Sequence, residues 1–260
     1  MTTHEPLSGK VAVITGAGRG IGQAIAKRFA EAGADIAICA RTLADLEDTQ
    51  ALVEAAGRRC LIGSVDLADP KSTEAFCRTV VDTFGTVHIL VNNAGAYLER
   101  GTVAESDPTL WWKTVEVNVR GPYMMTRYLL DHVAEGGKIL NFSTGKALTP
   151  GVNSASYHVS KAGMHMLTEC LANELWPRNI DVNNLVPGPT ATATFSREDP
   201  ANRSTPEQLL EKYKDDLPAG LPKWERVKHP DEIGELALWI VSKPTGGPTG
   251  QTFSLARRPL

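Results

Sequence analysis

Cysteine is scarce in this sequence: the 260 residues include only Cys39, Cys60, Cys77 and Cys170, and no two of them form a CxxC pair. No histidines cluster at the spacing of metal ligands either. Scattered cysteines of this kind are typical of small buried side chains in a reducing compartment. We therefore expect neither a disulfide framework nor a metal site.

An excess of charge and long apolar runs are also lacking. The 27 Lys and Arg residues against 30 Asp and Glu give a net charge of -3, with no run of like charges. This balance offers no electrostatic attraction for nucleic acid or an anionic membrane. No segment approaches about 18 consecutive apolar residues, and the N-terminal MTTHEPLSGK has no signal-peptide core. We expect a soluble, cytoplasmic protein with no nucleic-acid and no membrane partner.

The sequence does contain a regular alternation of apolar runs of strand length with amphipathic stretches of helix length. Such runs without polar alternation indicate strands covered on both faces, and intervening helices indicate parallel pairing. The predicted fold is α/β: a single Rossmann domain over residues 1–260, with helices on both faces of a doubly wound, mostly parallel sheet of about seven strands. The main apolar runs are KVAVIT (10–15), DIAICA (35–40), RRCLIGSVDL (58–67), VHILVNNAG (87–95), KILNFST (138–144) and IDVNNLVP (180–187).

The segment from about 188 to 228 is the least regular part of the chain, rich in Thr, Pro and charge. An irregular segment of this length that follows a strand end is typical of a binding lid rather than of core. We expect it to cover a substrate.

A glycine-rich loop, TGAGRGIG (15–22), joins the first predicted strand to the first predicted helix. Gly16 can turn sharply, Gly20 lets a phosphate approach the main chain, and Gly22 lets helix and strand pack closely. The helix N-terminus then offers unpaired N–H groups to a pyrophosphate. The loop, with a strand before it and a helix after it, predicts dinucleotide binding.

The spacing TG-three residues-GIG resembles the short-chain dehydrogenase/reductase family, and five further motifs follow in that family's order. Asp66-Leu67 matches its adenine contact, NNAG (92–95) its fourth-strand motif, and Asn118 its helix asparagine. Tyr157 and Lys161 in SYHVSKAG match its YxxxK, and Pro187-Gly188 the loop after its sixth strand. The resemblance covers nearly the whole chain, and its outline is closest to 3-oxoacyl reductase-type members.

This resemblance implies a nicotinamide cofactor and the residues that hold it. The family's PGxxxT spacing selects Thr192 for the nicotinamide carboxamide, with Thr190 as a rival in the same loop. The residues expected at the cofactor are Gly16, Arg19, Gly20, Ile21, Gly22, Arg41, Asp66, Leu67, Asn93, Ala94, Gly95, Tyr157, Lys161, Pro187, Gly188, Thr190 and Thr192.

The end of the second strand bears on the choice between NAD(H) and NADP(H). An NAD-preferring site usually has an acid there to bind the adenosine ribose, but this strand ends in Ala40-Arg41, with no carboxylate before Asp45. Arg41 could make charge-assisted bonds to a 2′-phosphate, and Arg19 provides a second cation in the glycine loop. We expect NADP(H) to be preferred, with NAD(H) possible.

Tyr157 and Lys161 lie one helical turn apart, and the ammonium should favour the phenolate, as would the positive ring of an oxidised nicotinamide. An unperturbed phenol, with a pKa of about 10, is a poor acid–base group near neutrality. The resemblance makes Tyr157 the general acid or base, Lys161 a contact to the nicotinamide ribose, and Asn118 the holder of a water. A hydroxyl is expected thirteen residues before the tyrosine, at Thr144; Ser143 is the alternative, since alternating side chains place only one at the substrate.

The function these residues indicate is the interconversion of a ketone and a secondary alcohol by hydride transfer, most simply as an NADPH-dependent carbonyl reductase. An NAD(P)-dependent alcohol, polyol or hydroxysteroid dehydrogenase is the alternative enzyme, and a non-catalytic NADP(H) sensor or scaffold the alternative class. The resemblance also implies a homotetramer or homodimer. The residues expected to line the pocket for a small carbonyl or alcohol substrate include Ala96, Tyr97, Leu98, Lys146, Val152 and Asn153.

Overall fold

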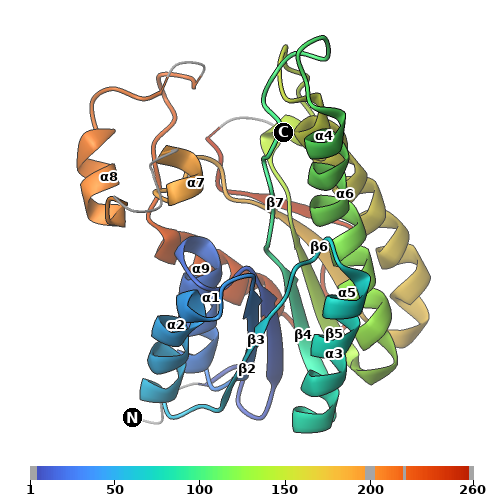
Figure 1. Cartoon of the computed structure of the whole chain (residues 1–260). Helices are drawn as coiled ribbons and strands as arrows, with labels where there is room; N and C mark the ends of the chain where they lie inside the picture. The colour runs from blue at the N-terminus through green and yellow to red at the C-terminus, as the bar shows by residue number, and fades with distance from the viewer. Residues whose placement is uncertain (1–4, 197–202, 219–220, 258–260) are drawn as a thin grey trace.

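A fully parallel sheet of seven strands, in the order β3-β2-β1-β4-β5-β6-β7, forms the centre of the molecule (Figure 1). The structure is a computed structural model that describes residues 5–196, 203–218 and 221–257. It confirms the predicted α/β fold with helices on both faces. The strands are β1 (Val11–Thr15), β2 (Asp35–Ala40), β3 (Cys60–Ser64), β4 (Val87–Asn92), β5 (Val133–Phe142), β6 (Asp181–Val186) and β7 (Thr252–Ser254).

Strands without polar alternation can serve two cores because successive side chains still point to opposite faces. Along β1, Ala12 and Ile14 join one buried cluster and Val13 joins the other. Along β2, Ile36 and Ile38 belong to the first cluster, while the alternate positions belong to the second. The sheet is therefore apolar on both sides, and each side needs a layer of helices.

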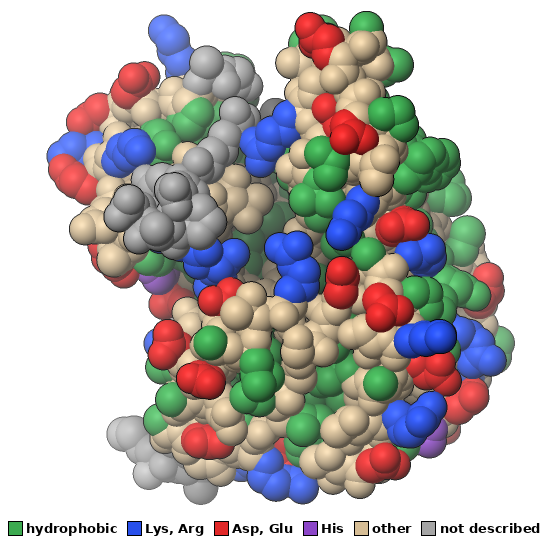
Figure 2. Space-filling view, viewed as in Figure 1, with side chains coloured by type: hydrophobic (Ala, Val, Ile, Leu, Met, Phe, Trp, Pro, Cys, Tyr) green, Lys and Arg blue, Asp and Glu red, His purple; other side chains and the backbone are tan. Residues whose placement is uncertain are grey.

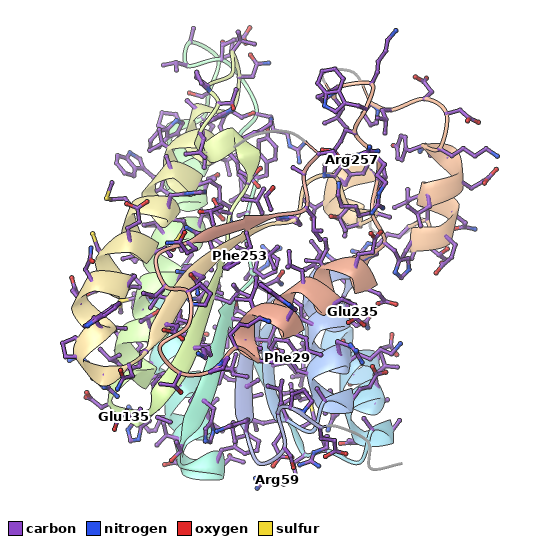
Figure 3. All side chains as sticks on the ribbon, turned by 180° about the vertical axis from the view of Figure 1, so that it is seen from behind. Phe29, Arg59, Glu135, Glu235, Phe253 and Arg257 are labelled. Carbon is purple, nitrogen blue, oxygen red and sulfur yellow. The ribbon has the colours of Figure 1, made fainter. Side chains whose placement is uncertain are left out.

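The first cluster lies beneath α1 (Gly20–Glu31), α2 (Ala44–Ala55) and α9 (Pro230–Val241), and it includes Phe29, which is fully buried (Figure 3). The opposite face carries α3, α4, α5 and α6 (Figure 1). These helices span Pro70–Phe84, Pro108–Val115, Gly121–Leu129 and Ala155–Leu175. Short 3-10 turns cover Leu130–His132, Gly145–Ala147 and Trp176–Arg178, and a π-helical turn covers Glu116–Arg120.

The segment expected to form a lid is more regular than its composition suggests. It contains α7 (Ala193–Ser196) and α8 (Pro206–Lys212), and a small apolar cluster is centred on Leu209. Thr205 begins α8 with a capping box, in which its side chain and that of Gln208 satisfy each other's main-chain N–H groups. The segment forms a separate lobe above α1, α2 and α9 (Figure 1). Part of the expected lid, residues 197–202 and 219–220, lies outside the described residues.

An isolated β-bridge joins Thr190 and Lys228 at the base of this lobe. The Lys228 side chain, 1% exposed, donates to Glu225 Oε1 at 2.7 Å. The second carboxylate oxygen of Glu225 accepts from the main-chain N–H of Arg257 at 3.1 Å, and Arg257 lies beyond the end of β7 (Figure 3). A buried ion pair therefore ties the last part of the chain to the base of the lobe.

Among the described residues, no helix is both long enough and apolar enough to span a bilayer.

Candidate active site

The order of the strands reverses direction between β1 and β4, and the loops that leave their carboxyl ends diverge there. In open α/β sheets this is the position where a crevice binds a ligand. The glycine loop leaves β1 at this point, and Asn93, Ala94 and Gly95 leave β4. The main-chain N–H of Ala94 donates to the Thr15 hydroxyl at 3.1 Å, which fixes the two loops together.

Gly16 and Gly22 occupy positions where a side chain would collide with main chain. A Cβ on Gly16 would lie 2.8 Å from Ala94 Cα, and one on Gly22 would lie 2.3 Å from the Gly16 carbonyl oxygen. Gly16 also has a φ of +66°, a conformation that L residues rarely adopt. Asn93 Nδ2 donates to the carbonyls of Thr15 and Gly16 at 2.9 and 3.0 Å. The loop is thus held in one close-packed shape.

The N-terminus of α1 fits an anionic group. Arg19 precedes the helix without a side-chain cap, so the first main-chain N–H groups of α1, including that of Ile21, have no side-chain acceptor among the described residues. Gly20, with a φ of +57°, faces Thr192: a Cβ on Gly20 would lie 3.2 Å from Thr192 Cγ2. Thr192 therefore borders the glycine loop, whereas Thr190 is 3% exposed and lies in the bridge to Lys228.

Other expected cofactor residues follow the carboxyl ends of β3 and β6. Pro187 and Gly188 follow β6, and Gly188 has a φ of +69°. Asp66 follows β3, where Oδ1 accepts from the main-chain N–H of Ala68 at 2.9 Å. Leu67 is buried against Gly121 of α5. Asp66 is therefore held by its own turn, next to a leucine that packs into the core.

Three arginines lie near one another at the outer end of the glycine loop. Burial, followed by the positive charge of Arg203, lowers the pKa of Arg19; Asp45 acts in the opposite direction, and Arg41 adds to the lowering. Arg19 pairs with Asp45 at 3.2 Å. Arg203, on the segment before α8, was not anticipated from the sequence, because nothing local ties it to the glycine loop. One carboxylate among three cations leaves a surplus of positive charge that would suit a phosphate.

Tyr157 and Lys161 both lie in the first two turns of α6, but their side chains interact differently from our expectation. Lys161 is 5% exposed, and its Nζ donates to the Phe142 carbonyl at 2.8 Å. The same nitrogen is 6.0 Å from the centre of the Tyr157 ring. The ammonium is thus directed at the end of β5 rather than at the phenol.

We expected Lys161 to lower the pKa of Tyr157, and this expectation is wrong for the protein without a bound cofactor. Burial, reinforced by Tyr97, raises the pKa of Tyr157 to about 12, while a hydrogen bond with Thr144 and the charge of Arg100 act in the opposite direction. Burial lowers the pKa of Lys161 to about 8. The protein's own side chains therefore keep Tyr157 protonated, as a proton donor must be.

Thr144 and Ser143, which follow the end of β5, differ in their surroundings. The Thr144 hydroxyl acts on Tyr157 to lower its pKa, and it accepts from the Lys146 N–H at 3.4 Å. Ser143 is 5% exposed, and its hydroxyl has no partner within the described part of the chain. Of the two, Thr144 is therefore the hydroxyl that lies beside the phenol.

Asn118 lies in the π-helical turn between α4 and α5. Pro122 cannot donate the main-chain hydrogen bond that an α-helix would bring to the Asn118 carbonyl, which favours a wider turn here. Both hydrogens of Asn118 Nδ2 are used, to the Ala96 carbonyl at 2.8 Å and Ser160 Oγ at 3.0 Å, and Oδ1 accepts from the Ala96 N–H at 2.7 Å. Asn118 therefore fixes the loop after β4 against α6.

Tyr97 lies directly against the candidate proton donor. The rings of Tyr97 and Tyr157 stack with centroids 4.4 Å apart and planes 15° apart. The Tyr97 hydroxyl donates to Ser154 Oγ at 2.6 Å and accepts from Lys146 Nζ at 3.2 Å. Burial acts to raise the pKa of Tyr97, but these two hydrogen bonds and the charges of Lys146 and Arg100 outweigh it, so this pKa is lowered.

No group of His, Cys, Asp and Glu side chains in the described ranges could hold a metal ion. The four cysteines are free, and burial raises the pKa of Cys39, Cys60 and Cys77 to about 12. These three thiols are unreactive at neutral pH.

The sequence and the fold were compared with those of known proteins. A family model described as short chain dehydrogenase matches residues 10–203. The uncharacterized oxidoreductase YxbG of Bacillus subtilis is 32% identical over 250 residues, which cover 95% of this chain and 90% of that protein. Human dehydrogenase/reductase SDR family member 4 is 30% identical over 254 residues, covering 97% and 88%. The solved structure of a Burkholderia cenocepacia short chain dehydrogenase in complex with NADP has a TM-score of 0.81 and 31% identity, covering 96% and 97%.

Proposed function

The chain belongs to the short-chain dehydrogenase/reductase family and is an oxidoreductase of alcohol and ketone groups, and from this premise we propose that it is an NADPH-dependent carbonyl reductase. The observation that carries the proposal is the grouping of Tyr157, Thr144 and Lys161 beside a glycine loop with an uncapped helix N-terminus. The chain resembles 3-oxoacyl reductases only in the general order of its motifs, and this resemblance does not identify a substrate.

In this proposal each side chain has a separate task. Tyr157 donates its phenolic proton to the carbonyl oxygen of the substrate, and Thr144 steadies that oxygen through its hydroxyl. Lys161 positions the cofactor through its ribose, and the remaining lone pair of Asn118 Oδ1 is the acceptor that would hold a water. The nicotinamide supplies the hydride when it is bound, and the protein contributes orientation and electrostatics.

The direct test is a screen of ketones and aldehydes with NADPH consumption as the readout, together with the matching alcohols and NADP+. We expect at least one ketone to be reduced, at a rate that scales with enzyme concentration. Turnover confined to alcohols would instead favour the alcohol, polyol or hydroxysteroid dehydrogenase. Tight NADPH binding without turnover of any compound would favour a non-catalytic sensor or scaffold and contradict the proposal.

The preference for NADP(H) is supported by the grouping of Arg19, Arg41 and Arg203 and by the missing acid at the end of β2. The Burkholderia relative was solved with NADP. We predict that Arg41→Asp lowers the NADPH-to-NADH ratio of kcat/KM by about 100-fold. Hydrogen bonds to charged groups contribute about 1.5–3 kcal/mol, and the new carboxylate would add repulsion.

A matched control for this variant is Arg127→Asp, which makes the same charge reversal on an exposed part of α5. The control should retain the wild-type ratio. An unchanged ratio in Arg41→Asp would overturn the NADP(H) assignment and leave the proposed reaction in place.

We further propose a cytoplasmic homotetramer or homodimer, since α4 and α6 expose large apolar side chains. Trp112, Val159 and Met166 are 62%, 53% and 60% exposed, whereas Met164, also on α6, is buried in the subunit. Light scattering that shows only monomer would contradict this assembly.

A further inference from the structure

Two cations converge on the aromatic ring that covers the candidate proton donor. The Arg100 guanidinium carbon lies 4.1 Å from the centre of the Tyr97 ring, and Lys146 Nζ lies 5.4 Å from it. Both positive charges therefore lie at the ring that stacks on the reacting phenol of Tyr157. Figure 2 shows Lys and Arg side chains around the hollow between the α7–α8 lobe and the rest of the molecule.

Lys146 is joined to the reaction centre by a short stretch of chain. It lies on the 3-10 turn Gly145–Ala147, which Thr144 caps. The Lys146 ammonium is exposed, and its one side-chain hydrogen bond among the described residues is the 3.2 Å contact with the Tyr97 hydroxyl. Its charged end can therefore reach a substrate that is hydrogen-bonded to Thr144.

Arg100 approaches from the other side, on the loop after β4. Its Nε donates weakly to the Tyr97 carbonyl at 3.4 Å, and the guanidinium carbon lies over the Tyr97 ring. This cation–π contact holds the charge in place while the other N–H groups stay available. The charge of Arg100 also acts on Tyr157.

Neither cation is paired with a carboxylate of the described chain. Glu99, the acid next to Arg100 in sequence, is 7% exposed, and its Oε1 accepts from the Gly101 N–H at 2.7 Å. The buried lysines outside the active site are treated differently, since Lys138 pairs with Asp181 and Lys228 with Glu225. Both cations beside Tyr97 are therefore free of any carboxylate in the described part of the chain and can bind a negatively charged group.

We propose that the substrate is an oxo acid, or its hydroxy acid, whose oxyanion is bound by Lys146 and Arg100 while its ketone oxygen lies at Tyr157 and Thr144. This inference rests on the proposed carbonyl reduction. Tyr97 is the positioning residue, because its ring and hydroxyl hold both cations at a fixed place beside Tyr157. A carboxylate and a phosphate share the chemistry that these cations recognise.

The test compares matched pairs of substrates with the full-length protein and NADPH. The first arm uses 2-oxobutanoate, 3-oxobutanoate and 4-oxopentanoate, each against its methyl ester, so that the distance between ketone and carboxylate varies. The second arm compares dihydroxyacetone phosphate with dihydroxyacetone. We expect the charged member of at least one pair to have a kcat/KM at least about tenfold above that of its neutral partner.

Lys146→Met should lower this charged-to-neutral ratio by about tenfold or more, mainly through KM, and Arg100→Met should do the same. Lys146→Arg should restore most of the ratio, because it restores the charge. Lys10→Met is the matched control: Lys10 is exposed and precedes β1, at the end of the sheet opposite the active site.

The results distinguish failure of the proposed oxyanion site from failure of the proposed carbonyl reduction. If no ketone consumes NADPH, the reaction itself is wrong. If ketones are reduced but neutral compounds are preferred, or if the ratio is the same in Lys146→Met and wild type, the oxyanion site is wrong and the reductase stands. A preference for the keto phosphate that is lost in Lys146→Met would confirm the oxyanion site and assign it to phosphate.

Discussion

Replacing Tyr157 with phenylalanine is expected to lower kcat about a thousandfold while leaving NADPH affinity within about threefold of wild type. The substitution removes one oxygen. The ring that stacks on Tyr97 remains, so the aromatic packing of the site is retained. What is lost is the proton donor and the hydrogen bond with Thr144. Single-turnover kinetics and a fluorescence titration of NADPH would measure the two quantities separately.

Tyr123→Phe provides the control for this experiment. Tyr123 is a 48% exposed phenol of α5, and loss of its hydroxyl should leave kcat unchanged. If Tyr157→Phe retained full turnover, the proton would have to come from another group and the proposed mechanism would be wrong.

Lys161→Met is expected to lower kcat/KM at least about a hundredfold and, at the same time, to change how stability depends on pH. The loss of activity follows from the proposed role of the ammonium in positioning the cofactor. The change in stability follows from burial, which lowers the pKa of Lys161 from 10.5 to about 8. The fold therefore bears the cost of a buried charge at neutral pH.

The sign of the pH effect can be stated in advance. Below pH 8, Lys161 is charged in both the folded and the unfolded chain, so the cost of burying the charge is fully present. Between pH 8 and about 10.5 the folded chain loses this proton while the unfolded chain keeps it, so wild-type stability gains from Lys161 as pH rises. The variant lacks this gain. The free energy of unfolding of Lys161→Met minus that of wild type should fall by about 2 kcal/mol between pH 7 and 9.5.

At pH 7, Lys161→Met removes the cost of burying a charge, but it also leaves the Phe142 carbonyl without its donor. The lost hydrogen bond costs about 1–3 kcal/mol, so the variant gains less free energy of unfolding than removal of the charge alone would give. Denaturant unfolding at several pH values would measure both. Lys10→Met, an exposed position, serves as the control. A difference that stays constant with pH would contradict the burial of a charged Lys161.

Strand positions were predictable wherever apolar residues run without interruption. The run DIAICA coincides with β2, because both faces of the sheet are covered there. β5, by contrast, begins at Val133, five residues before the predicted run. The added residues, VAEGG, do not form an uninterrupted apolar run, so the pattern did not predict them. The α8 helix was missed although Thr205, Pro206 and Gln208 form a readable capping pattern.

The sequence predicted which residues lie at the candidate site better than it predicted the contacts between their side chains. Motif spacing placed Tyr157, Lys161 and Thr144 together, but spacing along a helix cannot tell that the Lys161 ammonium turns to the Phe142 carbonyl. The stacking of Tyr97 on Tyr157 was likewise out of reach, because it depends on how two loops of different origin meet. For the same reason Arg100 and Arg203 had no sequence signal.

The bridge between Thr190 and Lys228 has a consequence for how this chain tolerates change in length. A lobe whose two ends are already tied together can gain or lose residues between them at little extra entropic cost. Such an insertion or deletion would alter the α7–α8 lobe without shifting the Pro187-Gly188 turn, which is held on the sheet side of the tie. The α7–α8 lobe can thus diverge in length between related chains while the loops at the carboxyl ends of the strands keep their shape.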